Sequence, residues 1–208
     1  MYRGVIFDLD GVLADTEGFY NRRREEYLAV IGFHWPGSTD FTGLNETAMW
    51  ETIVPEDGEL RQELLMGYRA YRRFHPTPFR ELANPQMVPL FRTLKARGLK
   101  LGVASSSDEE IIDQLLETME VEDLVDFRIS GRACRAYKPD PEIYLRALEA
   151  LGLSAGEAMA VEDSPAGILS ARRAGLTVLA LRPQGGAPLD QSQADRVIDQ
   201  LSDVLTLL

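Results

Sequence analysis

The sequence predicts an α/β protein with a doubly wound parallel sheet and a small all-helical domain inserted after the first strand. Three observations lead to this prediction. Short apolar runs alternate with helical patterns over most of the chain, which is typical of a sheet covered by helices. The runs are almost continuously apolar, as expected for parallel strands buried on both faces. One stretch, from residue 15 to residue 81, contains only helical patterns.

Five apolar segments are expected to form the strands of the sheet. Each is short, is rich in aliphatic residues, and is followed by polar or small residues. They are Gly4–Leu9, Leu99–Ala104, Phe127–Ile129, Ala158–Val161 and Thr177–Leu181. The sheet therefore combines the start of the chain with its second half.

Helix signals separate these strands. Pro89–Arg97 is expected to be helical and to end at Gly98, a residue type that commonly terminates helices. Three further helices are expected to begin at capping signals, namely Ser107-Asp108-Glu109-Glu110, Asp140-Pro141-Glu142 and Ser164-Pro165. Regular alternation of strands and helices indicates a doubly wound core rather than an antiparallel sandwich.

The alternation is interrupted once. Gly18–Ile31, Asn45–Ile53 and Glu59–Phe74 have the mixed apolar and charged faces of surface helices, with no persuasive strand between them. We therefore predict two domains. Residues 1–14 and 82–208 form the α/β core, and residues 15–81 form a helical insert.

The composition restricts the classes of partner. The chain of 208 residues carries a net charge of −11, which disfavours nucleic acid and anionic membranes, because those surfaces attract basic patches. The single cysteine, Cys134, cannot form an internal disulfide, and no apolar run reaches the roughly 18 residues of a membrane span. The acidic residue at position 8 comes too early for a signal peptide. We expect a cytoplasmic monomer that binds neither nucleic acid nor a membrane.

Asp8 and Asp10 follow the first predicted strand, in the sequence Phe7-Asp8-Leu9-Asp10-Gly11. Ligands of open α/β sheets bind at the carboxyl ends of the strands, and residues two apart in an extended chain project to the same side. A simple turn before Gly11 would also explain the pair. As a functional pair, Asp8 would act as a nucleophile with its ordinary pKa of about 3.9. Asp10 would then exchange a proton with a leaving oxygen.

The second predicted strand ends in a run of serines. Ser105 is placed to donate a hydrogen bond to a phosphoryl oxygen, with the backbone N–H groups of Ser106 and Ser107 beside it. Ser107 has its own explanation as the cap of the following helix. Serines after strands are common, so this run alone does not indicate a site.

Two further motifs contain charged residues. Lys138, before Pro139, would on its own be a solvated lysine at a helix start. Glu162 and Asp163 follow the fourth predicted strand and offer the hard oxygen ligands that Mg²⁺ prefers. Asp163 has the alternative role of a residue that begins the next helix.

Electrostatics connects these motifs. Asp8, Asp10, Glu162 and Asp163 would meet around a phosphate group, and like charges about 4 Å apart repel by about 4 kcal/mol at an effective dielectric of 20. One Mg²⁺ ion and Lys138 would relieve that repulsion. Phosphoryl transfer depends on this kind of positioning and charge neutralisation.

The order of the four motifs resembles that of the haloacid dehalogenase superfamily, over the whole chain. The residues that carry the resemblance are Asp8-x-Asp10-Gly11, Ser105, Lys138-Pro139 and Glu162-Asp163. The resemblance implies a Rossmann-like core and hydrolysis of a phosphomonoester, a small phosphorylated metabolite, through an aspartyl phosphate. It implies that Asp8 is the nucleophile, Asp10 the acid and base, and that Ser105 and Lys138 hold the phosphoryl group. The implied Mg²⁺ ligands are Asp8, the Asp10 backbone carbonyl, Asp163, and Glu162 either directly or through water.

The helical insert resembles the cap of the β-phosphoglucomutase-like phosphatase branch. Within it, Phe41–Ala48 resembles the specificity loop of such caps, and Gly43, Leu44 and Asn45 are its candidate substrate-binding residues. A simple connection between two helices would have the same composition. The run Arg22-Arg23-Arg24 beside Glu25-Glu26 is typical of a solvated helix face, with a substrate-binding cation as the alternative.

The resemblance leaves a mutase as the main alternative to a phosphatase. β-Phosphoglucomutases have a cap histidine where this chain has Tyr20, and an arginine where it has Asn45-Glu46. Both differences favour the phosphatase. A dehalogenase is disfavoured by Asp10, because a halide leaving group needs no proton. A catalytically silent binding protein is disfavoured by the presence of Asp8, Asp10 and Asp163 together.

Overall fold

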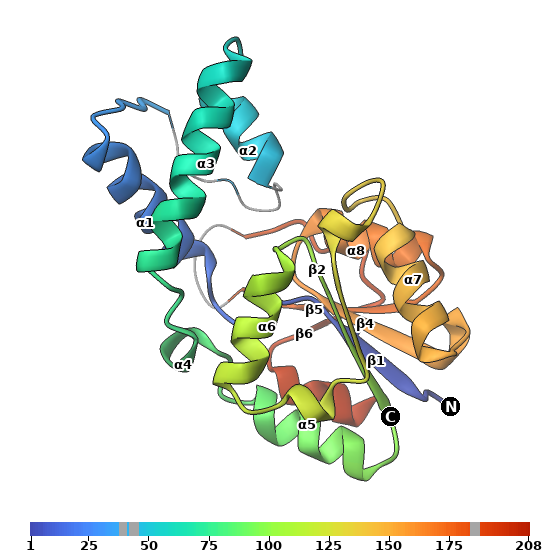
Figure 1. Cartoon of the computed structure of the whole chain (residues 1–208). Coiled ribbons are helices and arrows are strands. Elements are labelled where there is room, and N and C mark those ends of the chain that lie inside the picture. The colour runs from blue at the N-terminus through green and yellow to red at the C-terminus, as the bar shows by residue number, and fades with distance from the viewer. Residues whose placement is uncertain (38–40, 42–45, 184–187) are drawn as a thin grey trace. The chain divides into compact units, whose positions relative to one another are not determined.

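The computed structural model describes residues 1–37, 41, 46–183 and 188–208. The chain divides into two compact units (Figure 1). The first unit contains Met1–Asp15 and Phe79–Leu208, and the second contains Thr16–Pro78.

The first unit is built on a six-stranded, entirely parallel sheet with the order β3-β2-β1-β4-β5-β6. Its strands are β1 (Gly4–Phe7), β2 (Lys100–Ser105), β3 (Phe127–Ser130), β4 (Ala158–Glu162), β5 (Thr177–Leu181) and β6 (Arg196–Ile198). The predicted doubly wound α/β fold is confirmed. β1 is the central strand from which the chain proceeds first to one edge and then to the other, and such switch points are where ligands bind.

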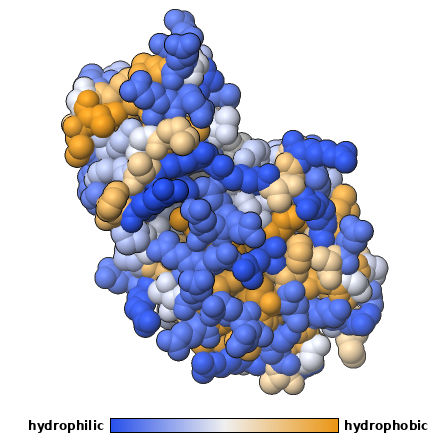
Figure 2. Space-filling model, in the orientation of Figure 1, coloured by the Kyte–Doolittle hydropathy of each residue, from blue (hydrophilic) through white to orange (hydrophobic). Residues whose placement is uncertain are grey.

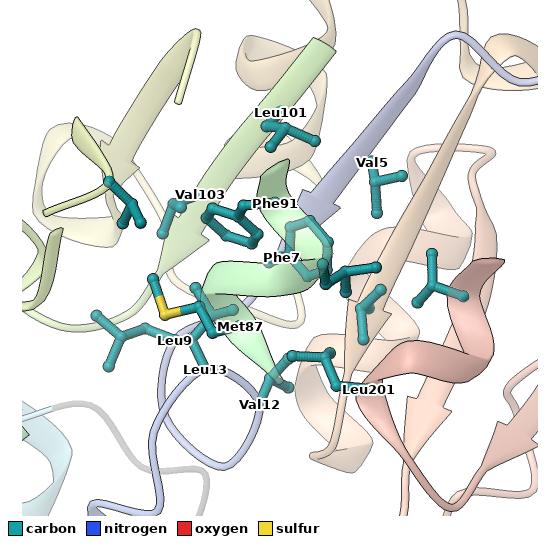
Figure 3. Packing of buried hydrophobic residues seen from close by; sticks show 14 of the residues in the cluster. Val5, Phe7, Leu9, Val12, Leu13, Met87, Phe91, Leu101, Val103 and Leu201 are labelled. Atoms are coloured by element: carbon teal, nitrogen blue, oxygen red, sulfur yellow. The ribbon is translucent and has the colours of Figure 1, made fainter. Parts of the chain in front are cut away.

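Alternating residues of β1 explain why helices cover both faces of the sheet. Val5 and Phe7 belong to one apolar cluster, which also contains Leu101 and Phe91 (Figure 3). Ile6 belongs to the cluster on the other face. All three β1 side chains have an exposed fraction of 0%. A strand buried on both faces cannot alternate between apolar and polar residues, which accounts for its continuous apolar run.

Helices lie on both faces of this sheet (Figure 1). The first cluster is covered by α5 (Met87–Ala96), α6 (Glu109–Thr118) and the 3₁₀ helix η4 (Leu201–Thr206). The second is covered by α7 (Glu142–Leu151) and α8 (Pro165–Arg173). The remaining short helices of this unit are α4 (Phe79–Leu82), η1 (Glu122–Leu124), η2 (Gly131–Ala133) and η3 (Ala155–Glu157).

The second unit is helical in the part that the structure describes. It consists of α1 (Glu17–Val30), α2 (Glu46–Ile53) and α3 (Gly58–Phe74). Asp57 caps α3 by accepting a hydrogen bond from the Leu60 N–H at 2.9 Å. The helices share a core in which Trp50 is fully buried and packs against the rings of Tyr27 and Tyr68.

Hydrophilic residues predominate on the face shown in Figure 2. Two arginines of α1, Arg23 and Arg24, are buried, so the expectation of a solvated helix face is wrong for these two residues. None of the helices within the described ranges combines the length and the apolar character needed to cross a bilayer.

Candidate active site

Three parallel strands bring the candidate residues together at their carboxyl ends. Asp8 directly follows β1, Ser105 ends β2, and Glu162 ends β4. The register aligns Phe7 with Val103 on β2 and with Val161 on β4, so these strand ends lie at one level of the sheet. All three polar residues are buried.

Lys138 lies at the centre of this group. Its Nζ donates hydrogen bonds to Asp8 Oδ1 at 2.6 Å, to Glu162 Oε1 at 2.7 Å and to the Ala104 carbonyl oxygen at 2.9 Å. All three donors of the ammonium group are therefore used. The lysine, 6% exposed at its side chain, is not the solvated residue that its local sequence suggests.

Glu162 is held from three directions. Its exposed fraction is 0%, and Oε1 accepts a 2.5 Å hydrogen bond from the Tyr144 hydroxyl in addition to that from Lys138. Its Oε2 accepts the Asp163 N–H at 3.3 Å. The carboxylate packs against the first turn of α8, where a Cβ atom on Gly167 would lie 2.0 Å from Glu162 Oε2. Only glycine leaves room for this carboxylate.

Asp10 hydrogen-bonds to the serine run that follows β2. Its Oδ2 accepts a hydrogen bond from Ser107 Oγ at 2.6 Å and a longer one from Ser105 Oγ at 3.4 Å. The Ser105 Oγ also accepts the Ser107 N–H at 3.0 Å. The expectation that Ser107 caps the following helix is wrong, because α6 has Asp108 at its N-cap and the Ser107 hydroxyl binds Asp10.

Asp163 is positioned by contacts on its backbone and by a close approach to Gly11. The Asp163 carbonyl oxygen accepts a 2.8 Å hydrogen bond from Gln191 Nε2, which also binds the Leu181 carbonyl. A Cβ atom on Gly11 would lie 2.1 Å from Asp163 Oδ2, and the φ of Gly11 is +79°. The glycine is required both by its left-handed backbone and by the adjacent carboxylate.

The charges of this site do not balance within the described residues. Asp8, Glu162 and Asp163 are buried and offer carboxylate oxygens within 4.8 Å of one another, against the single ammonium of Lys138. Burial is the largest influence on Asp8 and, with the Glu162 and Asp10 carboxylates, raises its pKa to about 8 against the opposing effect of Lys138. In the absence of a bound cation, the pKa of this carboxyl group is therefore raised above the ordinary value expected from the sequence.

The acids also shift the pKa values of the two side chains that bind them, Lys138 and Tyr144. Burial favours the neutral form of Lys138, but the Asp8 and Glu162 carboxylates outweigh it and raise the pKa of Lys138 above its ordinary range. Burial, with Glu162 beside the hydroxyl, raises the pKa of Tyr144 well above its usual value. We conclude that Lys138 is a cation and that Tyr144 is a neutral donor.

The oxygen-rich cluster fits a divalent cation. Three buried carboxylates with one ammonium leave an excess of negative charge that a hard cation would neutralise, and such ions bind oxygen ligands. The same cation would favour the ionised form of Asp8 and reverse the effect of burial. The Asp10 carboxylate is not part of this cluster, and the Asp10 backbone carbonyl remains the predicted ligand from that residue.

The family of the chain is established by a sequence comparison. A model of the haloacid dehalogenase-like hydrolase family matches residues 5–181, which include every strand end of the site. The chain belongs to this family.

Relatives among the haloacid dehalogenase-like hydrolases carry phosphatase names. The validoxylamine A 7'-phosphate phosphatase of Streptomyces hygroscopicus subsp. limoneus is 30% identical, with 98% of this chain and 96% of the relative aligned. The phosphoglycolate phosphatase of Aquifex aeolicus is 28% identical over 99% of this chain and 96% of its own length. Membership of the family and these relatives support a phosphatase enzyme.

A solved structure agrees with the fold. The β-phosphoglucomutase of Clostridium difficile superposes with a TM-score of 0.81, at 22% identity and over 98% of this chain and 93% of its own. At this identity the likeness concerns the architecture of the hydrolase family only.

Some site residues of this hydrolase were not found from the sequence. Tyr144 and Gln191 hold the acidic cluster in place, and neither belongs to a motif that suggests it. Gly167 ends the motif that contains Glu162 and Asp163, but the motif alone does not indicate its close approach to the Glu162 carboxylate. Tyr144 lies on the apolar face of a helix and was indistinguishable there from a core residue. Conversely, the predicted substrate residues Gly43, Leu44 and Asn45 lie outside the described residues. Ser106 lies in the turn after β2, between Ser105 and Ser107.

Proposed function

We propose that the chain is a Mg²⁺-dependent phosphomonoester hydrolase that acts through an aspartyl-phosphate intermediate on Asp8. The observation that carries this proposal is the buried group formed by Asp8, Lys138 and Glu162, with Asp163 within 4.8 Å of the other acids. A nucleophilic carboxylate next to a fixed ammonium and a cation-binding cluster is what phosphoryl transfer requires. The substrate class is a small phosphorylated metabolite such as a sugar phosphate.

In the first step an Asp8 oxygen attacks phosphorus, and the bond from phosphorus to the ester oxygen breaks. Asp10 gives its proton to that departing oxygen, so an alcohol leaves. In the second step Asp10 takes a proton from a water molecule, whose oxygen attacks phosphorus and releases Asp8 and inorganic phosphate. The hydrogen bond from Ser107 to Asp10 supports this assignment, because it orients the Asp10 carboxyl group.

Charge neutralisation is divided among the surrounding residues. Lys138 would exchange one of its three present acceptors for a phosphoryl oxygen. Ser105 and the Ser106 N–H would provide neutral donors, and the Ser107 N–H would join them by releasing its present contact with Ser105 Oγ. Asp8, Asp163 and the Asp10 carbonyl would hold the cation. When bound, Mg²⁺ would neutralise phosphoryl charge and hold the phosphoryl oxygens in place.

Glu162 is proposed to contact the cation through a water molecule and not as a direct ligand. Its Oε1 already accepts hydrogen bonds from Lys138 and Tyr144, which favours contact through water over direct ligation. Its main task would then be to fix Lys138 beside Asp8.

The second unit, Thr16–Pro78, is proposed to serve as the cap that selects the substrate, with Gly43, Leu44 and Asn45 in its specificity loop. At the position where a mutase would use an arginine, Glu46 is paired with Arg69 at 2.7 Å and Arg72 at 3.4 Å. Position 46 itself carries an acid and not the arginine of a mutase, so the phosphatase remains the favoured activity. The cytoplasmic location and the monomeric state stay predictions.

The test is phosphate release from a panel of phosphomonoesters, with Mg²⁺ and with EDTA. The panel includes β-glucose 1-phosphate, which is also followed for conversion to glucose 6-phosphate. Release that requires Mg²⁺ would support the phosphatase. Glucose 6-phosphate formed without comparable release would instead identify a mutase, and no turnover of any ester would contradict the proposal.

A further inference from the structure

A buried serine at the end of the edge strand β3 contacts the serine run of the site. Ser130 is the last residue of β3, is 4% exposed, and is aligned with Ser105 at the end of β2. Its Oγ donates a 2.7 Å hydrogen bond to the carbonyl oxygen of Ser107. The edge of the sheet is therefore tied to the residue whose hydroxyl binds Asp10.

The local role of Ser130 does not explain this hydrogen bond. Ser130 is the N-cap of the 3₁₀ helix η2, and in that role its Oγ accepts the Arg132 N–H at 3.2 Å. The cap uses a lone pair of the hydroxyl oxygen, whereas the hydroxyl proton is still to be donated. That proton goes to Ser107, which lies 23 residues earlier in the chain. The one hydroxyl therefore serves its own turn and the serine run.

Gly131 brings the same turn close to the serine run. Gly131 is buried, and a Cβ atom on it would lie 3.4 Å from the Ser106 Cα and 2.9 Å from the Tyr137 Cδ1. The backbone that follows β3 is thus packed closely against the backbone that follows β2. Ser130 adds a directed hydrogen bond to this packing.

The Ser107 backbone is held on two sides. Its N–H donates to Ser105 Oγ at 3.0 Å, and its carbonyl oxygen accepts the hydrogen bond from Ser130. Its hydroxyl then donates to Asp10 Oδ2 at 2.6 Å. In the proposed function the Ser107 N–H turns from Ser105 to the phosphoryl group. The contact with Ser130 involves no phosphoryl oxygen, so it keeps Ser107 in place throughout the reaction.

We propose that Ser130 is a positioning residue for Asp10 and acts through Ser107. A carboxyl group transfers a proton efficiently only when it lies within hydrogen-bond reach of the reacting oxygen. Ser130 fixes Ser107, and the Ser107 hydroxyl fixes the Asp10 carboxyl group. All of these residues belong to the first unit. The inference rests on the proposed function, in which Asp10 gives its proton to the departing oxygen.

The leaving group determines how much this positioning matters. An alkyl alkoxide is a poor leaving group, so its departure depends on the Asp10 proton as the bond from phosphorus to oxygen breaks. The p-nitrophenolate ion is stable without that proton. Loss of the Asp10 position should therefore slow the cleavage of alkyl esters more than that of p-nitrophenyl phosphate.

The test measures kcat/KM of Ser130→Ala with p-nitrophenyl phosphate and with the alkyl phosphomonoester that the wild type hydrolyses fastest. This ratio covers the steps up to departure of the alcohol, whereas the later hydrolysis of the aspartyl phosphate is common to both esters. For the alkyl ester we expect a fall of at least about tenfold, a part of the roughly 100-fold or more that general acid catalysis contributes. For p-nitrophenyl phosphate we expect a change of less than about threefold. Equal losses with the two esters, or no loss with the alkyl ester, would overturn the proposal.

Two further variants complete this comparison. Ser154→Ala is the matched control and should equal the wild type with both esters, because Ser154 begins η3 directly before β4, at the amino ends of the strands. Ser130→Cys nearly keeps the size of the side chain but replaces the hydroxyl with a weak donor. It is expected to show the same dependence on the leaving group, and it provides the reading if Ser130→Ala fails to fold.

A double-mutant cycle with Ser107→Ala tests whether Ser130 acts through Ser107, and it needs only the alkyl ester. The double variant is expected to be no slower than Ser107→Ala alone, because residues that act through one contact are not additive. Additive losses would contradict the proposed link through Ser107. No phosphate release by the wild type from any ester would instead refute the proposed function, and this inference with it.

Discussion

A chain of side-chain contacts links the interior of the core to the proposed nucleophile. The Tyr144 hydroxyl binds Glu162, Glu162 binds Lys138, and Lys138 binds Asp8, with donor–acceptor distances of 2.5, 2.7 and 2.6 Å. The Lys138 ammonium also lies 5.1 Å from the centre of the Tyr144 ring. Because every member is buried, the orientation of Asp8 depends on residues that would not touch the substrate.

Removal of the Tyr144 hydroxyl tests this chain of contacts. Tyr144→Phe keeps the ring but takes one donor from a buried carboxylate, so the free energy of unfolding is expected to fall by about 1.5–3 kcal/mol. We also expect kcat to fall more than KM rises, because Lys138 loses a fixed partner. Urea unfolding and steady-state kinetics measure the two effects. Tyr71→Phe, a hydroxyl deletion in the other unit, is the control, and equal effects of the two substitutions would contradict the prediction.

Gly167 makes room for Glu162, and an added methyl group should be destabilising. In Gly167→Ala the new Cβ would lie 2.0–2.1 Å from the Glu162 carboxylate atoms, so the free energy of unfolding is expected to fall by about 1–3 kcal/mol. Gly156→Ala places a Cβ with nothing within 4 Å and is expected to change stability by less than about 0.5 kcal/mol. Equal unfolding midpoints in urea for the two variants would show that the Glu162 carboxylate moves freely.

Single residues differ in how well the sequence predicts them. Asp8, Asp10 and Asp163 could be found because the order of the motifs that contain them resembles a known family. Tyr144 could not be found, because its pairing with Glu162 arises only when α7 packs against the sheet. The pKa of Asp8 could not be anticipated either, since it depends on burial among other acids.

At the scale of elements, an aspartate precedes each edge strand of the sheet. Asp126 comes before β3, donates its N–H to the Leu101 carbonyl and accepts the Leu101 N–H on Oδ2 at 2.8 Å. Asp195 comes before β6 and makes the same two contacts with Val178, also at 2.8 Å to Oδ2. Each aspartate therefore attaches an edge strand to its inner neighbour.

The contribution of Asp126 should depend on pH. Burial acts in the opposite direction, but hydrogen bonds from Lys95 and the Leu101 N–H lower the pKa of Asp126 below its ordinary value. A lowered pKa adds stability above the unfolded pKa of about 3.9, and this stability is lost as the pH falls through the folded-state value. The stability difference between the wild type and Asp126→Asn is therefore expected to be largest near neutral pH and to shrink below about pH 3.9.

Urea unfolding across that pH range measures the difference. Asp123→Asn changes a nearby exposed aspartate and should show no such dependence. A difference in the free energy of unfolding between the wild type and Asp126→Asn that stayed constant with pH would contradict the prediction.

Strands, like single residues, differ in how well the sequence predicts them. The five predicted strands were found because burial on both faces makes them continuously apolar. β6 was missed, because its three residues are Arg196, Val197 and Ile198 and only the last is buried. Its pairing with β5 depends on Asp195 and on the sheet edge, neither of which is visible locally.

For the whole molecule, the main electrostatic feature is the excess of acid in the core. The net charge of −11 includes three clustered buried carboxylates, two of which, Asp8 and Glu162, pair with one buried lysine. A ligand that binds only the folded state stabilises it. Divalent cations should therefore stabilise this protein through the site itself.

Thermal unfolding with increasing Mg²⁺ checks this expectation. At about 100 times the dissociation constant, Mg²⁺ is expected to add about 2.7 kcal/mol of stability and to raise Tm. Asp163→Asn should lose most of the increase, while Asp123→Asn should keep it. An equal rise in Tm for both variants would assign the effect to nonspecific screening.

Phosphate release by Asp8→Asn, compared with the wild type at saturating Mg²⁺, tests the central claim most directly. The substitution keeps the size of the side chain but removes the nucleophile, so kcat is expected to fall at least about 1,000-fold with the fold retained. Asp123→Asn, an exposed aspartate changed in the same way, should match the wild type. Turnover by a folded Asp8→Asn protein within about tenfold of the wild type would contradict the assignment of Asp8 as the phosphoryl acceptor.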